Sequence, residues 1–163
     1  MDMNSMFPGY VPVTGIVQNI INMHDCCSIM VSVLVGNNET VNLVIDEDTV
    51  VVDNRRIRRG MLIRGFYDAS KPVILIYPPQ YQAVAVVVLG RRDEGVTLAY
   101  FNRHLTASDN SLRLNIGRNT VVETVNGQLY RCDPSEHVLL VFYGATTRSI
   151  PPQTTPDRVI VFC

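Results

Sequence analysis

The sequence lacks the patterns from which catalysis or nucleic-acid binding is usually first suspected. It contains no G-x-S-x-G, H-E-x-x-H, P-loop or G-x-G-x-x-G motif, and its three histidines fall in no triad or metal pattern. Its 14 basic residues are offset by 15 acidic ones, for a net charge of −1, whereas nucleic-acid-binding proteins usually carry a basic excess. We therefore expect neither an enzyme nor a cofactor-binding protein, and nucleic acid is not the expected partner.

Long apolar runs and a secretory signal are missing as well. The longest apolar run, 83–89, is far shorter than the roughly 20 residues that a membrane helix needs, so we expect no membrane span. The first ten residues have neither the cationic nor the apolar region of a signal peptide. The sequence thus leaves the compartment open between the cytoplasm and a spore or cell surface reached without such a signal.

Cysteines are few, and their spacing is too irregular for a disulfide framework. His24-Asp25-Cys26-Cys27 gathers four potential ligands, but the second well-spaced pair that a structural zinc site needs is absent. We expect a polar loop there and no metal. Outside a reducing cytosol, disulfides through Cys26, Cys27 and Cys163 would join copies covalently. In the alternative interpretation all four cysteines stay reduced, with Cys132 acting as a small core residue.

What the sequence does contain is an internal repeat. A pattern of apolar residues ending in T-V-V, at 43–51, recurs 71 residues later at 114–122. Phe66-Tyr67 recurs at an offset of 76, and Pro-Pro-Gln at 78–80 recurs at an offset of 73. Such drift is typical of matched strands joined by loops of unequal length. We therefore predict an N-terminal arm at 1–13, a first repeat at 14–82 and a second at 83–163.

Strand signals dominate both repeats. Short β-branched runs alternate with Gly, Asn, Asp and Pro at the spacing of an all-β barrel or sandwich. Turns are expected at 36–38, 53–54 and 126–127, because Asn, Asp and Gly accept the positive φ of tight turns. The predicted strands are 15–21, 29–35, 40–45, 49–52, 61–67, 73–77, 82–89, 97–101, 111–116, 120–124, 138–143 and 158–162.

These elements predict an all-β protein built from two tandem small barrels of OB-like type, related by internal duplication and preceded by an extended arm. Five or six short strands in about 75 residues suit a small closed barrel. A small immunoglobulin-like sandwich is the competing fold, but the repeats are shorter than its roughly 100 residues. Each repeat would be marginal alone, since small domains bury a limited share of their surface.

Three strings go beyond generic β sequence. They are F-Y-D-A-S-K-P-V-I-L-I-Y-P-P-Q-Y at 66–81, S-D-N-S-L-R-L-N-I at 108–116 and Y-G-A-T-T-R-S-I-P-P-Q-T-T-P-D-R-V-I-V at 143–161. Across 14–163 the chain resembles uncharacterised two-repeat β proteins of anaerobic, spore-forming Gram-positive bacteria. The resemblance implies the tandem β fold and a bacterial source, and it implies no catalytic residue.

The first functional hypothesis is a structural subunit that associates with itself, in the extended case into a filament at a spore or cell surface. Its basis is the apolar, weakly charged composition and the absence of catalytic motifs. The apolar residues of the arm, which would dock on the second barrel or on a neighbouring copy by strand addition, are Phe7, Tyr10, Val11 and Val13.

The second hypothesis is an OB-type binding module for an oligonucleotide, a glycan or a protein partner. OB barrels bind such ligands on a strand face and its flanking loops. Basic side chains would meet phosphate, and aromatic rings would offer stacking surfaces. The predicted ligand face consists of Arg55, Arg56, Tyr67, Tyr77 and Tyr81.

Overall fold

The computed structural model describes residue 7 and residues 9–163, which form two compact units. The barrel unit is Tyr10–Asp93, and the open-sheet unit is Glu94–Cys163 together with residues 7 and 9. The expected domain boundary at 82/83 is wrong, because it falls within a strand, Gln80–Val88, that belongs to the barrel unit. The first predicted strand also begins earlier than expected, so residues 10–13 are part of the barrel and not of an arm.

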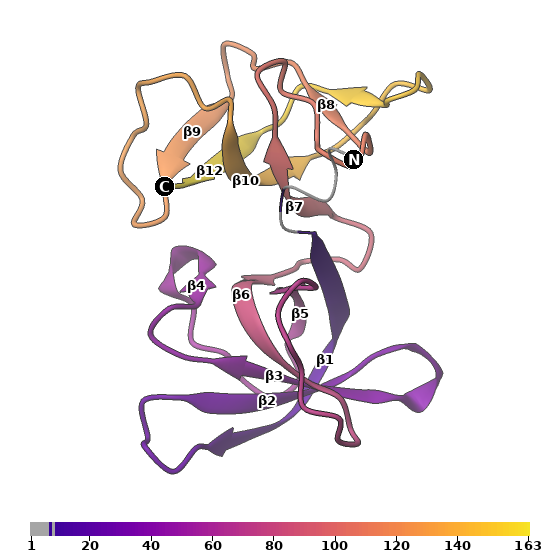
Figure 1. Ribbon diagram of the computed structural model, residues 1–163, viewed down its shortest axis with the longest axis vertical. Helices are drawn as coiled ribbons and strands as arrows, with labels where there is room; N and C mark the ends of the chain where they lie inside the picture. The colour runs from indigo at the N-terminus through magenta and orange to yellow at the C-terminus, as the bar shows by residue number, and fades with distance from the viewer. Residues whose placement is uncertain (1–6, 8) are drawn as a thin grey trace. The chain divides into compact units, whose positions relative to one another are not determined.

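Over the described residues the elements are strands, most of which Figure 1 labels, and two 3-10 turns. The strand predictions at 40–45 and 158–162 match the observed bounds, whereas 73–77 was predicted as a strand and lies in a loop. In chain order the elements are β1 (Tyr10–Asn22), β2 (Ile29–Leu34), η2 (Gly36–Asn38), β3 (Thr40–Ile45), β4 (Val50–Val51), η3 (Val52–Asn54), β5 (Leu62–Asp68), β6 (Gln80–Val88), β7 (Gly95–Phe101), β8 (Arg113–Leu114), β9 (Val121–Thr124), β10 (His137–Tyr143), β11 (Gln153–Thr154) and β12 (Arg158–Phe162).

Five strands of the barrel unit close into a barrel. β1 pairs with β2 and β5, β2 pairs with β3, and β6 pairs with β5 on one side and with β3 on the other. The β3–β6 ladder is parallel and the other four ladders of the ring are antiparallel. Closure removes the sheet edges that would otherwise pair with other chains.

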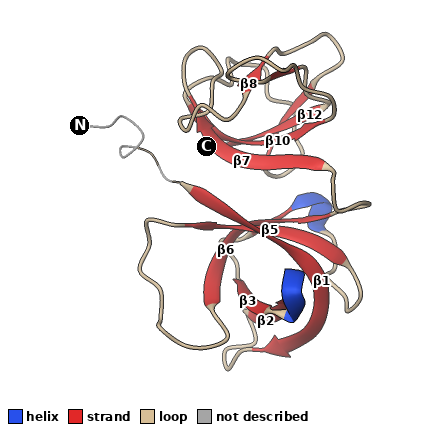
Figure 2. Cartoon of the chain, turned by 90° about the vertical axis from the view of Figure 1, so that its right-hand side faces the viewer, coloured by secondary structure: helices blue, strands red, loops and turns tan. Residues whose placement is uncertain are grey.

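The long first strand makes this closure possible. The first half of β1 pairs with β5 and the second half with β2, with a register shift between Val17 and Asn19. Figure 2 shows β1 curving around the barrel. At Gly15, a Cβ atom would lie 2.1 Å from the carbonyl oxygen of Leu34 on β2. Glycine therefore allows β2 to approach the point where β1 bends.

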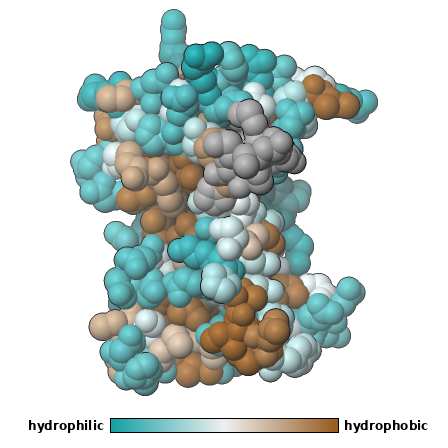
Figure 3. Space-filling model, in the orientation of Figure 1, coloured by the Kyte–Doolittle hydropathy of each residue, from teal (hydrophilic) through white to brown (hydrophobic). Residues whose placement is uncertain are grey.

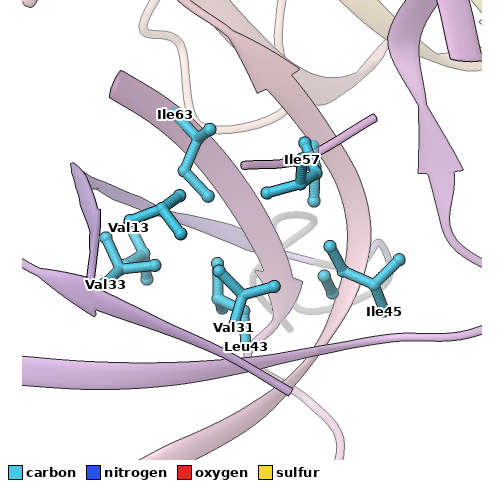
Figure 4. Close-up of a cluster of buried hydrophobic side chains, with 10 residues drawn as sticks. Val13, Val31, Val33, Leu43, Ile45, Ile57 and Ile63 are labelled. Carbon is cyan, nitrogen blue, oxygen red and sulfur yellow. The ribbon is translucent and has the colours of Figure 1, made fainter. Parts of the chain in front are cut away.

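The barrel core follows from the alternation of apolar side chains along these strands. Figure 4 shows the cluster, in which side chains from β1, β2, β3 and β5 point toward one another. Burying an aliphatic side chain of this size contributes about 1.5–3 kcal/mol. The fully or nearly fully buried members are Val13, Val17, Val31, Val33, Leu43, Ile45, Ile57, Ile63, Ala83 and Val86.

The open-sheet unit has a four-stranded sheet in the order β7-β10-β12-β9 and a separate parallel pair, β8 and β11. Over the described residues this sheet does not close, so the prediction of a second barrel does not hold for this unit as it stands. The all-β class and one closed barrel are confirmed. The buried members of this unit's own core are Phe101, Ala107, Leu112, Leu114, Leu139, Val141, Val159 and Val161.

Several ladder positions of one unit have counterparts in the other. In the barrel unit Val50 lies opposite Ala85 in a parallel ladder, and in the open-sheet unit Val121 lies opposite Arg158 in a parallel ladder. These pairs are related by the sequence offsets of 71 and 73. The same holds for a second parallel ladder. Asn42 lies opposite Gln80 in the barrel unit, and the residues at the same offsets, Arg113 and Gln153, lie opposite each other in the open-sheet unit.

A threonine bracket recurs in the same way. The Thr49 hydroxyl donates to the Ala83 carbonyl oxygen at 2.8 Å and accepts the Asp46 N–H at 3.1 Å. In the open-sheet unit the Thr120 hydroxyl donates to the Pro156 carbonyl oxygen at 2.6 Å and accepts the Gly117 N–H at 3.0 Å. The T-V-V triplet of the sequence repeat therefore begins, in both units, with a threonine that ties one turn to a later part of the chain, β6 in the barrel unit and the segment before β12 in the open-sheet unit.

Candidate functional site

The most prominent surface feature is the loop between β5 and β6, residues 69–79, which we call the β5–β6 loop. Its five apolar residues at 73–77 are all exposed: Leu75 is 95% exposed, Tyr77 86% and Ile74 66%. Figure 3 shows hydrophobic residues gathered on the surface of the barrel unit. Contiguous exposed apolar residues of this kind mark interaction sites more often than scattered ones do.

The loop is anchored at both ends and turns sharply at its tip. The Ile76 N–H donates to the Ile74 carbonyl oxygen at 3.0 Å, which places Leu75 at the apex. At one end the Asp68 carboxylate accepts the Ser70 N–H at 2.9 Å. At the other end the Pro79 carbonyl oxygen accepts the N–H of Asn42 on β3 at 2.8 Å. The apolar tip is therefore held out by a hydrogen-bonded base.

Two tyrosines of the predicted ligand face form part of that base. The Tyr67 and Tyr81 rings stack with centroids 3.8 Å apart and an interplanar angle of 3°. Burial, followed by the hydrogen bond with Tyr81, raises the pKa of Tyr67 above its ordinary value. A small pocket of about 60 Å³ lies beside them, lined in part by Lys71, Pro72 and Val73. Each stacked ring has one face against the other, and both tyrosines are half-buried and pack against the barrel core.

The two arginines of the predicted ligand face lie elsewhere along the barrel. Arg55 and Arg56 are exposed on the connection between η3 and β5. The next part of this connection lies against the middle of β1, where the Arg59 Nε donates to the Gln18 carbonyl oxygen at 3.1 Å. Tyr67, in contrast, pairs with Val11 near the start of β1. Along β1, Gln18 and Val11 are separated by roughly 20 Å, so this end of the connection does not lie beside the tyrosine pair.

All four cysteines are exposed and carry free thiols. Cys26 and Cys27 lie in the β1–β2 turn, where the Asp25 carboxylate accepts the Cys27 N–H at 3.1 Å and the Ser28 N–H at 3.2 Å. This is the polar loop that the sequence predicts. Cys132 is exposed rather than in the core, contrary to the alternative interpretation of that residue. Among the residues that the structure describes, no group of three or more His, Cys, Asp or Glu side chains could hold a metal ion.

The predicted arm divides between the two units. Tyr10, Val11 and Val13 pair with β5 as part of β1, and burial, followed by the charge of Asp68, raises the pKa of Tyr10. Phe7 instead belongs to the open-sheet unit, where its ring stacks on Tyr100 of β7 with centroids 3.8 Å apart and planes 6° apart. Residues 1–6 and 8 of the predicted arm lie outside the described part of the chain.

The counterpart of the β5–β6 loop in the open-sheet unit is the connection between β10 and β11, residues 144–152, which we call the β10–β11 loop. It is polar and internally hydrogen-bonded: the Thr147 N–H donates to the Gln153 carbonyl oxygen at 2.9 Å, and the Thr154 hydroxyl donates to the Ala145 carbonyl oxygen at 2.8 Å. With Asn115 and Asp157 it borders a polar pocket of about 460 Å³. Ile150, at 91%, is its one large exposed apolar side chain.

The exposed loop was missed because its sequence reads as a strand. V-I-L-I-Y is rich in β-branched residues, which favours a strand, but all five side chains are apolar, without the alternation of a half-buried strand. Prolines at 72, 78 and 79 flank the run on both sides, and proline fits poorly into a sheet ladder. Those prolines were the available signal for a loop.

No family model, curated protein or solved structure matches this chain. The resemblance to two-repeat β proteins of spore-forming bacteria therefore stays a prediction from the sequence. Among the described residues no helix is long and apolar enough to cross a membrane.

Proposed function

We propose that the protein is a non-enzymatic structural subunit that assembles with copies of itself by exchanging its N-terminal segment. The observation that carries this proposal is the stacking of Phe7 on Tyr100 at 3.8 Å, combined with the division of the chain directly after Gly9. Phe7 packs with the open-sheet unit, while Tyr10 begins the first strand of the barrel unit. The segment therefore joins one unit to the other.

Exchange re-forms between two copies a contact that already exists within one copy, so it needs little new complementarity. Gly9 supplies a hinge, because it is exposed and a Cβ atom there would meet no heavy atom within 4 Å. Reciprocal exchange between two copies gives a dimer, whereas successive one-way exchange gives a filament. A filament at a spore or cell surface is the extended form of this proposal, with Cys26, Cys27 and Cys163 as the thiols available to lock it.

We also propose that both units descend by duplication from one OB-type barrel. The barrel unit's ring order, β1-β2-β3-β6-β5, supports the OB-type assignment, since an OB fold is a five-stranded Greek-key barrel. The recurring ladder pairs and the two threonine brackets support the duplication. In this proposal the open-sheet unit is a copy that has lost its continuous β2-like strand and keeps only isolated bridges, Phe101 with Ala107 and Thr106 with Arg113.

The test of assembly is the mass of the full chain in solution over a range of concentrations, by light scattering after size exclusion. We expect concentration-dependent oligomers, and we expect Phe7→Ala to shift them to monomers because an aromatic pair contributes about 0.5–1.5 kcal/mol beyond its buried area. Phe7→Tyr keeps the aromatic ring and should form oligomers as the wild type does. Ile150→Ala, an equally conservative truncation of an exposed side chain, is the control. A monomer at all concentrations, or oligomers indifferent to Phe7→Ala, would contradict the proposal.

An OB-type binding module for an oligonucleotide, glycan or protein is the second candidate. The stacked pair of Tyr67 and Tyr81 at the base of an exposed loop favours it, since OB barrels use the loop before their last strand in binding. Retention on immobilised single-stranded DNA that weakens with salt, and that Arg55→Ala combined with Arg56→Ala abolishes, would support the nucleic-acid form. No retention at low salt would exclude that form.

A further inference from the structure

We propose that the β5–β6 loop docks the protein on a lipid surface by inserting its tip, centred on Leu75, into the interfacial region of a bilayer. This inference goes beyond self-assembly and rests on a different part of the chain from Phe7. The proposed partner of the apolar loop is thus a membrane, and the experiments below distinguish it from a second copy or another protein.

The shape of the loop favours a medium that surrounds it. Exposure is greatest at the apex, 95% at Leu75, and falls to about half at Val73 on one side and Ile76 on the other. In extended segments neighbouring side chains point to opposite sides, yet the side chains of this run are exposed throughout. A flat protein surface would cover one side of such a wedge, whereas lipid covers every side.

The backbone of the loop carries fewer N–H donors than a loop of ordinary composition. Of the eight residues from Pro72 to Pro79, three are prolines, which have no N–H to bury. The Ile76 N–H is already paired with the Ile74 carbonyl oxygen at the tip. Unpaired backbone groups are the main obstacle to placing irregular structure in hydrocarbon, so this tip suits shallow insertion.

The residues at the base of the wedge suit the headgroup region. Tyr77, 86% exposed, sits where the apolar run meets Pro78, and tyrosine is enriched at membrane–water interfaces. Lys71, the only lysine of the chain, lies at the other end, where its long stem can reach the headgroups. Asp68 balances its charge nearby, and residues 72–79 carry no charge. Apolar insertion rather than attraction to anionic lipid is therefore the expected driving force.

The size of the apolar surface argues against a second copy as the occupant. A standard protein interface uses about 20–30 residues on each side, whereas this apolar run has five. In the open-sheet unit, the pocket of about 460 Å³ is lined mostly by polar residues, and the pocket of about 200 Å³ is partly lined by the rings of Phe7 and Tyr100. For lipid the same surface is sufficient for weak binding, and we expect reversible docking no stronger than that of one myristoyl chain, about 10⁴ M⁻¹.

The chain contains no tryptophan, so one substitution places a single depth reporter in the loop. We expect the emission of Leu75→Trp to shift to the blue with phosphatidylcholine vesicles and to be quenched by brominated phosphatidylcholine. Ile150→Trp, in the equivalent β10–β11 loop, is the matched control and should show neither effect. An unshifted Leu75→Trp emission at high lipid concentration would overturn the proposal.

Vesicle flotation of the full chain is the second measurement. We expect Leu75→Asp to lower the flotation of the protein at least about tenfold, and Ile150→Asp to leave it unchanged. Raising the salt from about 0.1 M to about 1 M should change it little, because the contact is apolar. If the wild-type chain stays with the soluble fraction, or if Leu75→Asp floats as well as the wild type, the loop does not dock on lipid. Loss of oligomers in Leu75→Asp without any vesicle binding would assign the loop to a protein contact.

Discussion

The two units differ most in the strand that begins each of them. β1 has 13 residues and pairs with β5 along its first half and with β2 along its second half. β7 has seven residues and pairs with β10 in the corresponding way, but it ends at Phe101. There the Asn102 side chain accepts the His104 N–H at 2.9 Å and the Thr106 N–H at 3.1 Å, which turns the chain away. In the barrel unit the two halves of β1 therefore form two ladders, whereas β7 ends before a second ladder begins.

A single position shows why β1 can do this. Gly15 lies opposite Ile63 on β5, and Ala99 lies opposite Leu139 on β10. Ile63 and Leu139 are related by the repeat offset of 76, so Gly15 and Ala99 are counterparts. The barrel unit has no room for a methyl group at this position, because the Leu34 carbonyl oxygen occupies it. The open-sheet unit, which has no ladder equivalent to β1–β2 among its described residues, carries the methyl group.

The largest effect is therefore expected from Gly15→Ala. A Cβ atom 2.1 Å from a backbone oxygen cannot be relieved by rotating a side chain, so β1 and β2 must separate, and we expect a loss of about 3 kcal/mol in the free energy of unfolding. Urea denaturation followed by circular dichroism measures it. The converse change, Ala99→Gly, should cost only about 0.5–1 kcal/mol. Equal stability of Gly15→Ala and the wild type would show that closure does not depend on this approach.

An intermediate effect is expected at the two threonine brackets. Thr49→Val and Thr120→Val each remove one donated and one accepted hydrogen bond while keeping the shape of the side chain. We expect each to lower the free energy of unfolding by about 1–2 kcal/mol. Hydrogen exchange read by mass spectrometry would locate each loss in its own unit. If only one of the two substitutions lowered protection from hydrogen exchange, the threonine bracket would stabilise that unit and not the other.

The smallest effect on stability is expected from Asp133, which lies in the connection between β9 and β10 of the open-sheet unit. The Ser135 N–H donates to the Asp133 carboxylate at 2.9 Å, and this hydrogen bond is the main reason that the pKa of Asp133 lies below its ordinary value. A lowered folded-state pKa stabilises the fold above the ordinary value, and the contribution is lost as pH falls through the lower value. An NMR titration of the Ser135 amide should have its midpoint below about pH 4. A midpoint at or above that value would contradict the assignment, and Asp133→Asn should abolish the transition.

Much of this architecture could be predicted from residue patterns. The β-branched runs at 40–45 and 158–162 gave strands with the expected bounds, and Asn37, Asp53 and Gly127 adopt the positive φ expected of their turns. Thr49 and Thr120, which the repeat offset of 71 relates, make similar hydrogen bonds in the two units. The closed barrel of the first unit was predicted, but the open sheet of the second was not, because closure depends on where a strand bends and on whether a methyl group meets a carbonyl oxygen across a ladder.

The candidate surface was harder to predict than the fold. Of the residues in the expected ligand face, Tyr67 and Tyr81 do stack, Tyr77 lies in the exposed loop, and Arg55 and Arg56 are exposed on the connection between η3 and β5. Apolar β-branched residues at 73–77 read as a strand on propensity alone. Whether such a run pairs or protrudes is decided by the availability of a neighbouring strand, which is a tertiary property.

The stacking of Phe7 on Tyr100 also sets an order of events on the ribosome. Phe7 is made before the barrel unit, but its partner ring lies on β7, which is made only after every strand of the barrel unit. Domains fold as their sequences emerge, so we expect the barrel to form while Phe7 still has no partner. On a message carrying several ribosomes, a nearby nascent chain would then offer its own β7 at about the same moment. The choice between a closed monomer and a linked chain of subunits would in that case be made during synthesis, before the finished protein is diluted into its surroundings.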